Sequence, residues 1–102
     1  MVRYTAEAGR DGGLVLTLTG HAEGSPGVCA AVSGLLWALT AYLAEDPAAA
    51  VRERVLDSGR AVFRFTGDDR TLGAFALVRS GLDLLARSYP DSICKEVSKD
   101  DA

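Results

Sequence analysis

The chain has few of the residues from which metal centres and disulfide frameworks are built. Its 102 residues include only two cysteines and one histidine. Cys29 and Cys94 lie far apart in the sequence, and neither has a second thiol or an imidazole at a spacing typical of a zinc site. Two cysteines are also too few for the disulfide frameworks of small secreted domains. We therefore expect free thiols, no bound metal and no cofactor, as is usual in a reducing cytoplasm.

Long apolar runs and an excess of positive charge are also missing. The opening stretch MVRYTAEAGR lacks the apolar segment of a signal peptide, and no run of about eighteen apolar residues predicts a transmembrane span. The formal net charge of -3 gives no long-range attraction for nucleic acid or for an acidic membrane surface. The sequence therefore predicts a cytoplasmic protein with no direct contact to nucleic acid or membrane.

The residues that are present suffice for one globular domain. Apolar residues make up 48% of the chain and charged residues 25%, which is the balance of an ordinary globular protein. No linker or low-complexity segment divides the chain. We expect a single domain over residues 1–98 and a polar tail over residues 99–102.

The first half of the chain predicts a strand hairpin followed by a helix. Residues 2–8 and 14–20 are expected to form strands around a Gly-rich turn, and leucines alternate along the second of them. Ser25 and Pro26 signal the start of a helix, with the serine hydroxyl as its cap, and Asp46 before a proline marks its end. One face of this helix is apolar, formed by Val28, Val32, Leu35, Leu36, Leu39 and Leu43.

The second half predicts the same succession of elements. The segment AAAVRERVL is ambiguous between helix and strand, but the turn at 57–59 and the alternating segment 60–66 favour a hairpin. A helix is expected over residues 71–88, after two aspartates that suit its positive end. Residues 93–97 are expected to form a short strand on which Cys94 is buried. The apolar stripe of the second helix is Leu72, Phe75, Val78, Leu82 and Leu85.

The predicted order of elements is β-β-α-β-β-α-β. Two hairpins and two amphipathic helices predict an α+β fold, a two-layer sandwich in which both helices pack on one face of a small sheet. Trp37, on the first helix, is expected in the core rather than at an interface between chains.

The stretch TGHAEGSPGVCAAVSGL, residues 19–35, carries the candidate chemistry. A thiol is a good nucleophile only as a thiolate, which a helix N-terminus or a nearby imidazolium favours. Cys29 falls in the first turn of the predicted helix, where unpaired N–H groups are also suited to hold an oxyanion. His21 ends a strand and begins the loop before the helix. The two residues can therefore form a nucleophile with its proton acceptor.

A structural explanation of the same residues stays open on composition alone. A cysteine before an apolar run is usually a small buried residue, and a single loop histidine is usually just exposed. Strand parity places His21 on the side away from the leucines, so Gly20 must turn the chain for His21 to meet Cys29. Ser33, one helical turn after Cys29, bonds either near the thiol or back to its own helix.

The pattern GHA, a short loop and VCAAVS before a helix resembles the ribosomal-processing cysteine protease family, Prp. The resemblance extends through GRAVFRFT, the second helix and YPDSI over nearly the whole chain. It implies a small cytoplasmic homodimeric endopeptidase that removes the N-terminal extension of large-subunit ribosomal protein twenty-seven. It also implies that His21 is the catalytic histidine, Cys29 the nucleophile, and Gly20 and Ser33 supporting residues.

The chain departs from the family pattern in the loop between His21 and Cys29. In the family this loop is longer and carries an acidic residue three positions before the cysteine, where this chain has Pro26. Glu23 is a candidate to substitute for that acid. The leading hypothesis is a cysteine endopeptidase that cuts a peptide or a ribosomal-protein extension. The alternative is a non-catalytic or retargeted homologue that binds a peptide or a ribosomal partner in the same groove.

Overall fold

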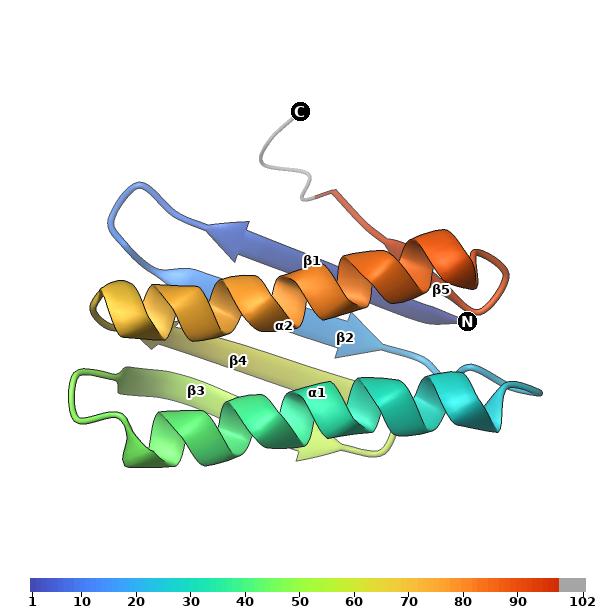
Figure 1. The fold of residues 1–102 in the computed structure, drawn as a ribbon, viewed down its shortest axis with the longest axis horizontal. Helices are drawn as coiled ribbons and strands as arrows, with labels where there is room; N and C mark the ends of the chain where they lie inside the picture. The colour runs from blue at the N-terminus through green and yellow to red at the C-terminus, as the bar shows by residue number, and fades with distance from the viewer. Residues whose placement is uncertain (98–102) are drawn as a thin grey trace.

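A computed structural model describes residues 1–97 and confirms the predicted order of elements (Figure 1). The final strand ends at Lys95 rather than at residue 97, and the second helix begins at Asp69 rather than at residue 71. The polar tail predicted over residues 99–102 lies outside the described residues. The elements in chain order are β1 (Val2–Ala8), β2 (Leu14–Thr19), α1 (Pro26–Glu45), β3 (Ala50–Asp57), β4 (Arg60–Thr66), α2 (Asp69–Ser88) and β5 (Ile93–Lys95).

The five strands form one mixed sheet in the order β3-β4-β2-β1-β5. Neighbouring strands are antiparallel except β1 and β5, which run parallel. Figure 1 shows both helices on the same face of this sheet, with α2 toward β1 and β5 and α1 toward β3. The predicted two-layer α+β sandwich is confirmed, and the opposite face of the sheet carries no helix among the described residues.

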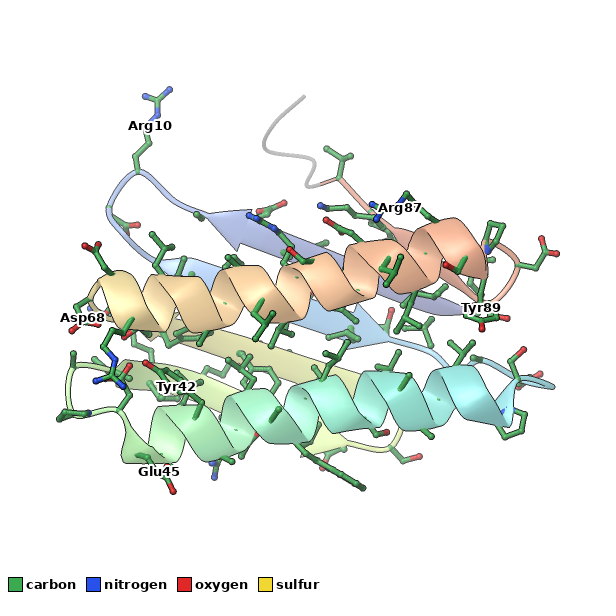
Figure 2. The ribbon with its side chains drawn as sticks, in the orientation of Figure 1. Arg10, Tyr42, Glu45, Asp68, Arg87 and Tyr89 are labelled. Atoms are coloured by element: carbon green, nitrogen blue, oxygen red, sulfur yellow. The ribbon has the colours of Figure 1, made fainter. Side chains whose placement is uncertain are left out.

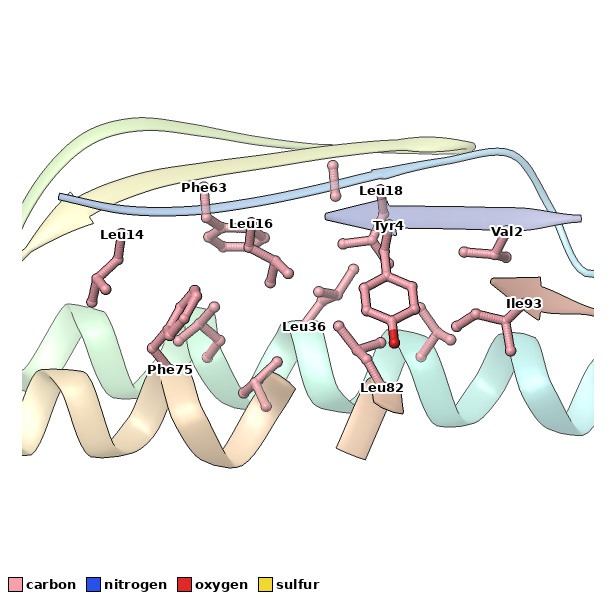
Figure 3. Close-up of a cluster of buried hydrophobic side chains, with 14 of the residues drawn as sticks. Val2, Tyr4, Leu14, Leu16, Leu18, Leu36, Phe63, Phe75, Leu82 and Ile93 are labelled. Atoms are coloured by element: carbon pink, nitrogen blue, oxygen red, sulfur yellow. The ribbon is translucent and has the colours of Figure 1, made fainter. Parts of the chain in front are cut away.

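The core lies between the sheet and the two helices (Figure 3). Alternation along the strands places Leu14, Leu16 and Leu18 of β2 inside, as predicted, because successive side chains of a strand point to opposite faces. Phe65 of β4 and Phe75 of α2 meet edge to face, with ring centroids 6.0 Å apart. The predicted stripe of α1 is buried at Val28, Val32, Leu36, Leu39 and Leu43, and Leu35 packs against it while partly buried.

Two predicted core residues lie on the surface instead. Leu72 is 47% exposed, because Thr71 before it turns inward to bond the helix cap and is itself fully buried. Trp37 is 65% exposed, because it follows the buried Leu36 and the helical rotation carries its indole away from the sheet. Cys94 is partly buried rather than buried, since Ile93 before it takes the core-facing position on β5.

Helix α1 has the length and composition of a membrane span, with a mean hydropathy of 1.7 over its most apolar window. The helix contains no uninterrupted apolar run of that length, because serine, glycine and threonine interrupt its apolar residues. Only 28% of that window is buried, in the stripe that packs against the sheet and α2. A single helix of this kind is weak evidence for a membrane span, and the compact α+β fold is that of a soluble domain.

Polar contacts join the end of α1 to the start of α2. Asp68 caps α2 by accepting hydrogen bonds from the Arg70 and Thr71 N–H groups, and the Thr71 hydroxyl accepts one from the Asp68 N–H. The same hydroxyl donates to Asp46 Oδ2 at 2.6 Å, and this bond lowers the pKa of the Asp46 carboxyl. Figure 2 shows Tyr42 of α1 pointing toward this end of α2. One buried threonine thus links the end of α1 to the start of α2.

We predict that Thr71→Val lowers the free energy of unfolding by about 2 kcal/mol, because it removes both a helix cap contact and a hydrogen bond to a carboxylate without changing the side-chain shape. Urea denaturation measures the loss. The control is Thr40→Val, since the Thr40 hydroxyl donates only within its own helix, to the Leu36 carbonyl at 2.9 Å. Equal losses in the two variants would contradict the role given to Thr71.

A second polar contact crosses from the sheet to α2. The buried Tyr4 hydroxyl donates to Asp83 Oδ1 at 2.6 Å, and Lys95 Nζ lies 3.3 Å from the same oxygen. Burial, together with the bond to Asp83, raises the pKa of Tyr4 well above its ordinary value. Burial alone would raise the pKa of Asp83, but the hydrogen bonds from Tyr4 and Lys95 outweigh it, so that this pKa lies below its ordinary value.

We predict that Asp83→Asn destabilises the domain by about 1–2 kcal/mol at neutral pH. Because the pKa of Asp83 is lower in the folded than in the unfolded chain, its stabilisation is present above the unfolded value of about 3.9 and is lost as the pH falls through the folded value. Denaturation curves of the parent and the variant should therefore converge at low pH. Asp91→Asn, at an exposed position before β5, is the control and should leave the stability at neutral pH almost unchanged.

Candidate active site

The start of α1 differs from the predicted cap. Pro26 occupies the first turn as expected, but the Ser25 side chain makes no capping hydrogen bond. The Ser25 hydroxyl instead pairs with the Ser92 hydroxyl at 2.9 Å, in the segment that leads into β5. The predicted serine cap is therefore wrong, because the Ser25 hydroxyl is directed toward Ser92 and accepts no N–H of α1, and the bond to Ser92 ties the loop before α1 to the segment before β5.

Gly20 turns the chain between β2 and the loop, as strand parity predicts. Its φ is +90°, a backbone conformation that residues with a side chain rarely adopt. A Cβ at this position would collide with the carbonyl oxygen of Met1, the residue directly before β1. The Gly20 N–H donates to the Gly59 carbonyl at 2.9 Å and so fixes the turn against the β3–β4 hairpin. Only glycine meets the dihedral and the steric requirement together.

His21 is exposed and lies over the turn between β3 and β4. A Cβ built on Gly59 would come within 2.6 Å of His21 Nε2, so the imidazole rests against the bare backbone of that turn. Gly59 has a φ of +77°. The absence of a side chain at Gly59 therefore provides the space in which the imidazole lies.

Cys29 is partly buried in the first turn of α1, and its thiol donates to the Ala22 carbonyl at 3.6 Å. Ala22 directly follows His21 and is buried, so this bond holds the thiol beside the segment that carries the imidazole. Within residues 1–97 no hydrogen bond joins Cys29 to His21.

One cavity of about 200 Å³ brings these residues together. The predicted residues Gly20, His21, Cys29 and Ser33 all line it, whereas Glu23 does not. The described part of the chain holds no cluster of three His, Cys, Asp or Glu side chains that could bind a metal ion. The remaining lining residues are Val2, Leu18, Val32, Leu36, Leu56, Asp57, Ser58, Gly59, Arg60 and Ala61.

Sequence reasoning missed the wall that the β3–β4 turn contributes. The DSGR segment, residues 57–60, predicts only a turn, and no local signal connects it to His21. The connection depends on the pairing of β2 with β4, in which Thr19 faces Arg60. That pairing joins residues far apart in the sequence.

The N–H groups at the start of α1 are fewer than expected for an oxyanion site. Pro26 has no N–H, and the Val28 and Cys29 N–H groups both donate to the Ser25 carbonyl, at 3.1 and 3.2 Å. Gly27 therefore carries the one N–H of this first turn that makes no hydrogen bond within residues 1–97, and it is exposed outside the cavity lining. A helix start led by proline offers a smaller set of anion donors than the sequence prediction assumed.

Comparison with known proteins supports the resemblance at the level of the fold. The ribosomal processing protease Prp from S. aureus, in complex with a covalently linked product peptide, matches with a TM-score of 0.77 and 18% identity over 96% of this chain and 100% of that one. Its complex with a substrate peptide matches with a TM-score of 0.73 and 17% identity over the same shares. SMU.848 from Streptococcus mutans matches with a TM-score of 0.72 and 25% identity over 94% of this chain and 96% of that one. No protein-family model and no curated protein matches the chain.

We predict that Gly59→Ala displaces the His21 imidazole, because the added methyl group needs the space that the ring occupies. His21 is the only histidine, so its ring protons give one set of NMR signals to follow. Gly12→Ala is the matched control, since Gly12 has a φ of +83° and nothing within 4 Å of an added Cβ. Both variants lose about 1–2 kcal/mol of stability from the dihedral alone. Identical histidine spectra in the two variants would refute this placement of the ring.

Proposed function

We propose that this protein is a cysteine endopeptidase in which Cys29 is the nucleophile and His21 is its proton acceptor. The observation that carries the proposal is the cavity at the start of α1, which a thiol and an imidazole from separate segments both line. The shared fold supports it, since one structure with this fold holds a covalently linked product peptide. The chain has the Prp-like fold, and we propose that it also has the cysteine endopeptidase activity.

In the proposed reaction the Cys29 thiol releases its bond to the Ala22 carbonyl and gives its proton to His21. The sulfur attacks the scissile carbonyl carbon, and the protonated imidazole then returns the proton to the leaving amine. Water hydrolyses the resulting thioester and regenerates the thiol. Ser33, one turn after Cys29 on the same face of α1, lies close enough to the cavity to orient the substrate or the imidazole.

The proposed substrate is a peptide segment, the N-terminal extension of large-subunit ribosomal protein twenty-seven. The Prp-like fold and the two peptide complexes that share it support this choice. We further propose that the protein works in the cytoplasm as a homodimer, as the family resemblance implies. Glu23, exposed in the loop, is proposed to take the place of the acid that Pro26 replaces.

A second function is favoured by the hydrogen bond that the Cys29 thiol makes. In this arrangement the thiol donates to a backbone carbonyl rather than to His21, as is usual for a cysteine that has only a structural role. A non-catalytic or retargeted homologue would use the same cavity to bind a peptide or a ribosomal partner. The two functions differ in whether the bound peptide is cut.

We predict that the protein shortens extended ribosomal protein twenty-seven from its own host, and that Cys29→Ala lowers the rate by about 10³-fold or more. His21→Ala should lower it by about 10²–10⁴-fold, because it removes the general base. Mass spectrometry of the product measures the cut. Binding of the extension without cleavage by the parent protein would favour the second function.

We also predict that iodoacetamide at neutral pH modifies Cys29 about tenfold or more faster than Cys94, because only Cys29 lies at a helix start beside an imidazole. Both thiols are partly buried, so exposure alone does not separate them. Peptide mapping by mass spectrometry gives both rates in one sample. Equally slow modification of the two thiols would count against an activated Cys29.

A further inference from the structure

Strand β3 is an outer strand of the sheet, with β4 on one side and no strand on the other among the described residues. Its turn to β4 has two residues, so Asp57 and Arg60 form a hydrogen-bonded pair, and such pairs alternate along an antiparallel ladder. The hydrogen bond from the Gly20 N–H to the Gly59 carbonyl supports this assignment. It shows that the backbone of Gly59 faces the β2 side, so that the backbone groups of the next residue, Arg60, face β3. The backbone groups of Leu56 and Arg54 therefore point outward from the sheet.

A β-bulge limits this free edge to a short segment. The register between β3 and β4 shifts between Val51 and Glu53, so regular pairing extends only over residues 53–57. The charged residues Arg52 and Glu53 lie at the bulge. A bulge and charged side chains on an edge strand both disfavour long edge-to-edge pairing between copies of a protein. The edge that remains fits a few residues of an extended peptide better than it fits a second β3.

The free edge is continuous with the candidate active site. Leu56 and Asp57, the last residues of β3, line the cavity that also holds Cys29 and His21. Leu56 is 39% exposed, so α1 leaves this part of the strand open. Trp37 follows Ser33 by one helical turn and is also exposed, so an apolar side chain lies on α1 one turn beyond the cavity, although Trp37 does not line the cavity itself.

We propose that the substrate binds as an added β-strand, pairing its backbone with the outward N–H and C=O groups of Leu56 and Arg54, so that the chain continues into the cavity beside Cys29. Backbone pairing gives affinity for any extended peptide, and side chains at alternate positions give selectivity. Peptide residues opposite Leu56 face the side of the sheet on which α1 and Trp37 lie, because directly paired residues share a face. The proposal rests on the proposed function for the choice of a peptide ligand.

The first test measures hydrogen exchange by NMR in the Cys29→Ala protein, which binds without cutting. The probe is a synthetic ten-residue peptide that spans the boundary of the extension of ribosomal protein twenty-seven. We expect the peptide to slow exchange of the Arg54 and Leu56 amides about tenfold or more, and to leave Val55 and Asp57, which already bond to β4, unchanged. Equal effects at all four amides, or none with the peptide bound, would overturn the proposal. Slowing that depends on protein concentration without peptide would assign the edge to a second copy instead.

The second test replaces the outward donor. Leu56→Pro removes an N–H that takes no part in the ladder, and proline is tolerated on an edge strand in that position. Leu56→Ala is its matched control, because it shortens the same side chain and keeps the N–H. We expect Leu56→Pro to weaken peptide binding about tenfold more than Leu56→Ala does, with an unchanged circular dichroism spectrum showing that the fold persists in both variants. Equal binding by the two variants would overturn the pairing.

Singly N-methylated peptides extend the test without changing the protein. Methylation should weaken binding only at alternate positions on one side of the scissile bond, because only alternate peptide N–H groups face β3. If the parent protein does not cut the peptide but the alternating pattern appears, the binding mode stands and the proposed catalysis fails. If cleavage occurs and methylation at every position has the same effect, the catalysis stands and the binding mode fails.

Discussion

The structure depends on the burial of only one face of its sheet. Alternating apolar side chains on β2 and β4 require a cover, and two helices of twenty residues each supply it from the same side. With both helices on that side, the start of α1 lies next to the turn between β3 and β4. The candidate site forms where these two segments meet, and β3 is an unpaired edge strand beside it.

The fold was predictable because its signals are local. Alternation marks the strands, turn residues mark the hairpins, and apolar stripes mark the helices, and each signal needs only a few neighbouring residues. The errors occur where a distant contact decides the orientation. Thr71 turns inward because its hydroxyl donates a hydrogen bond to Asp46. The hydropathy pattern predicts Leu72 as the buried residue, because hydropathy does not depend on hydrogen bonds to distant residues.

The site was only partly predictable for the same reason. His21, Cys29 and Ser33 are found from their spacing around one loop, and the need for Gly20 follows from strand parity. The Gly59 backbone under the imidazole depends on how two hairpins pair, which no segment of the sequence specifies alone. The direction of the Cys29 thiol depends on the bend that brings the Ala22 carbonyl to it.

The hydrogen bond between Ser25 and Ser92 links the loop before Cys29 to the entry of β5, across 67 positions of the sequence. Coupling between two sites is reciprocal, so a ligand that favours a loop without this bond also loosens β5, and a change that loosens β5 also frees the loop. Strand β5 pairs with β1, and the carbonyl of Met1, directly before β1, lies against Gly20. An affinity tag fused next to β1 or β5 would therefore change the position of the loop at the entrance of the cavity. Peptide affinities measured on differently tagged proteins would then differ because of the tag as well as the peptide.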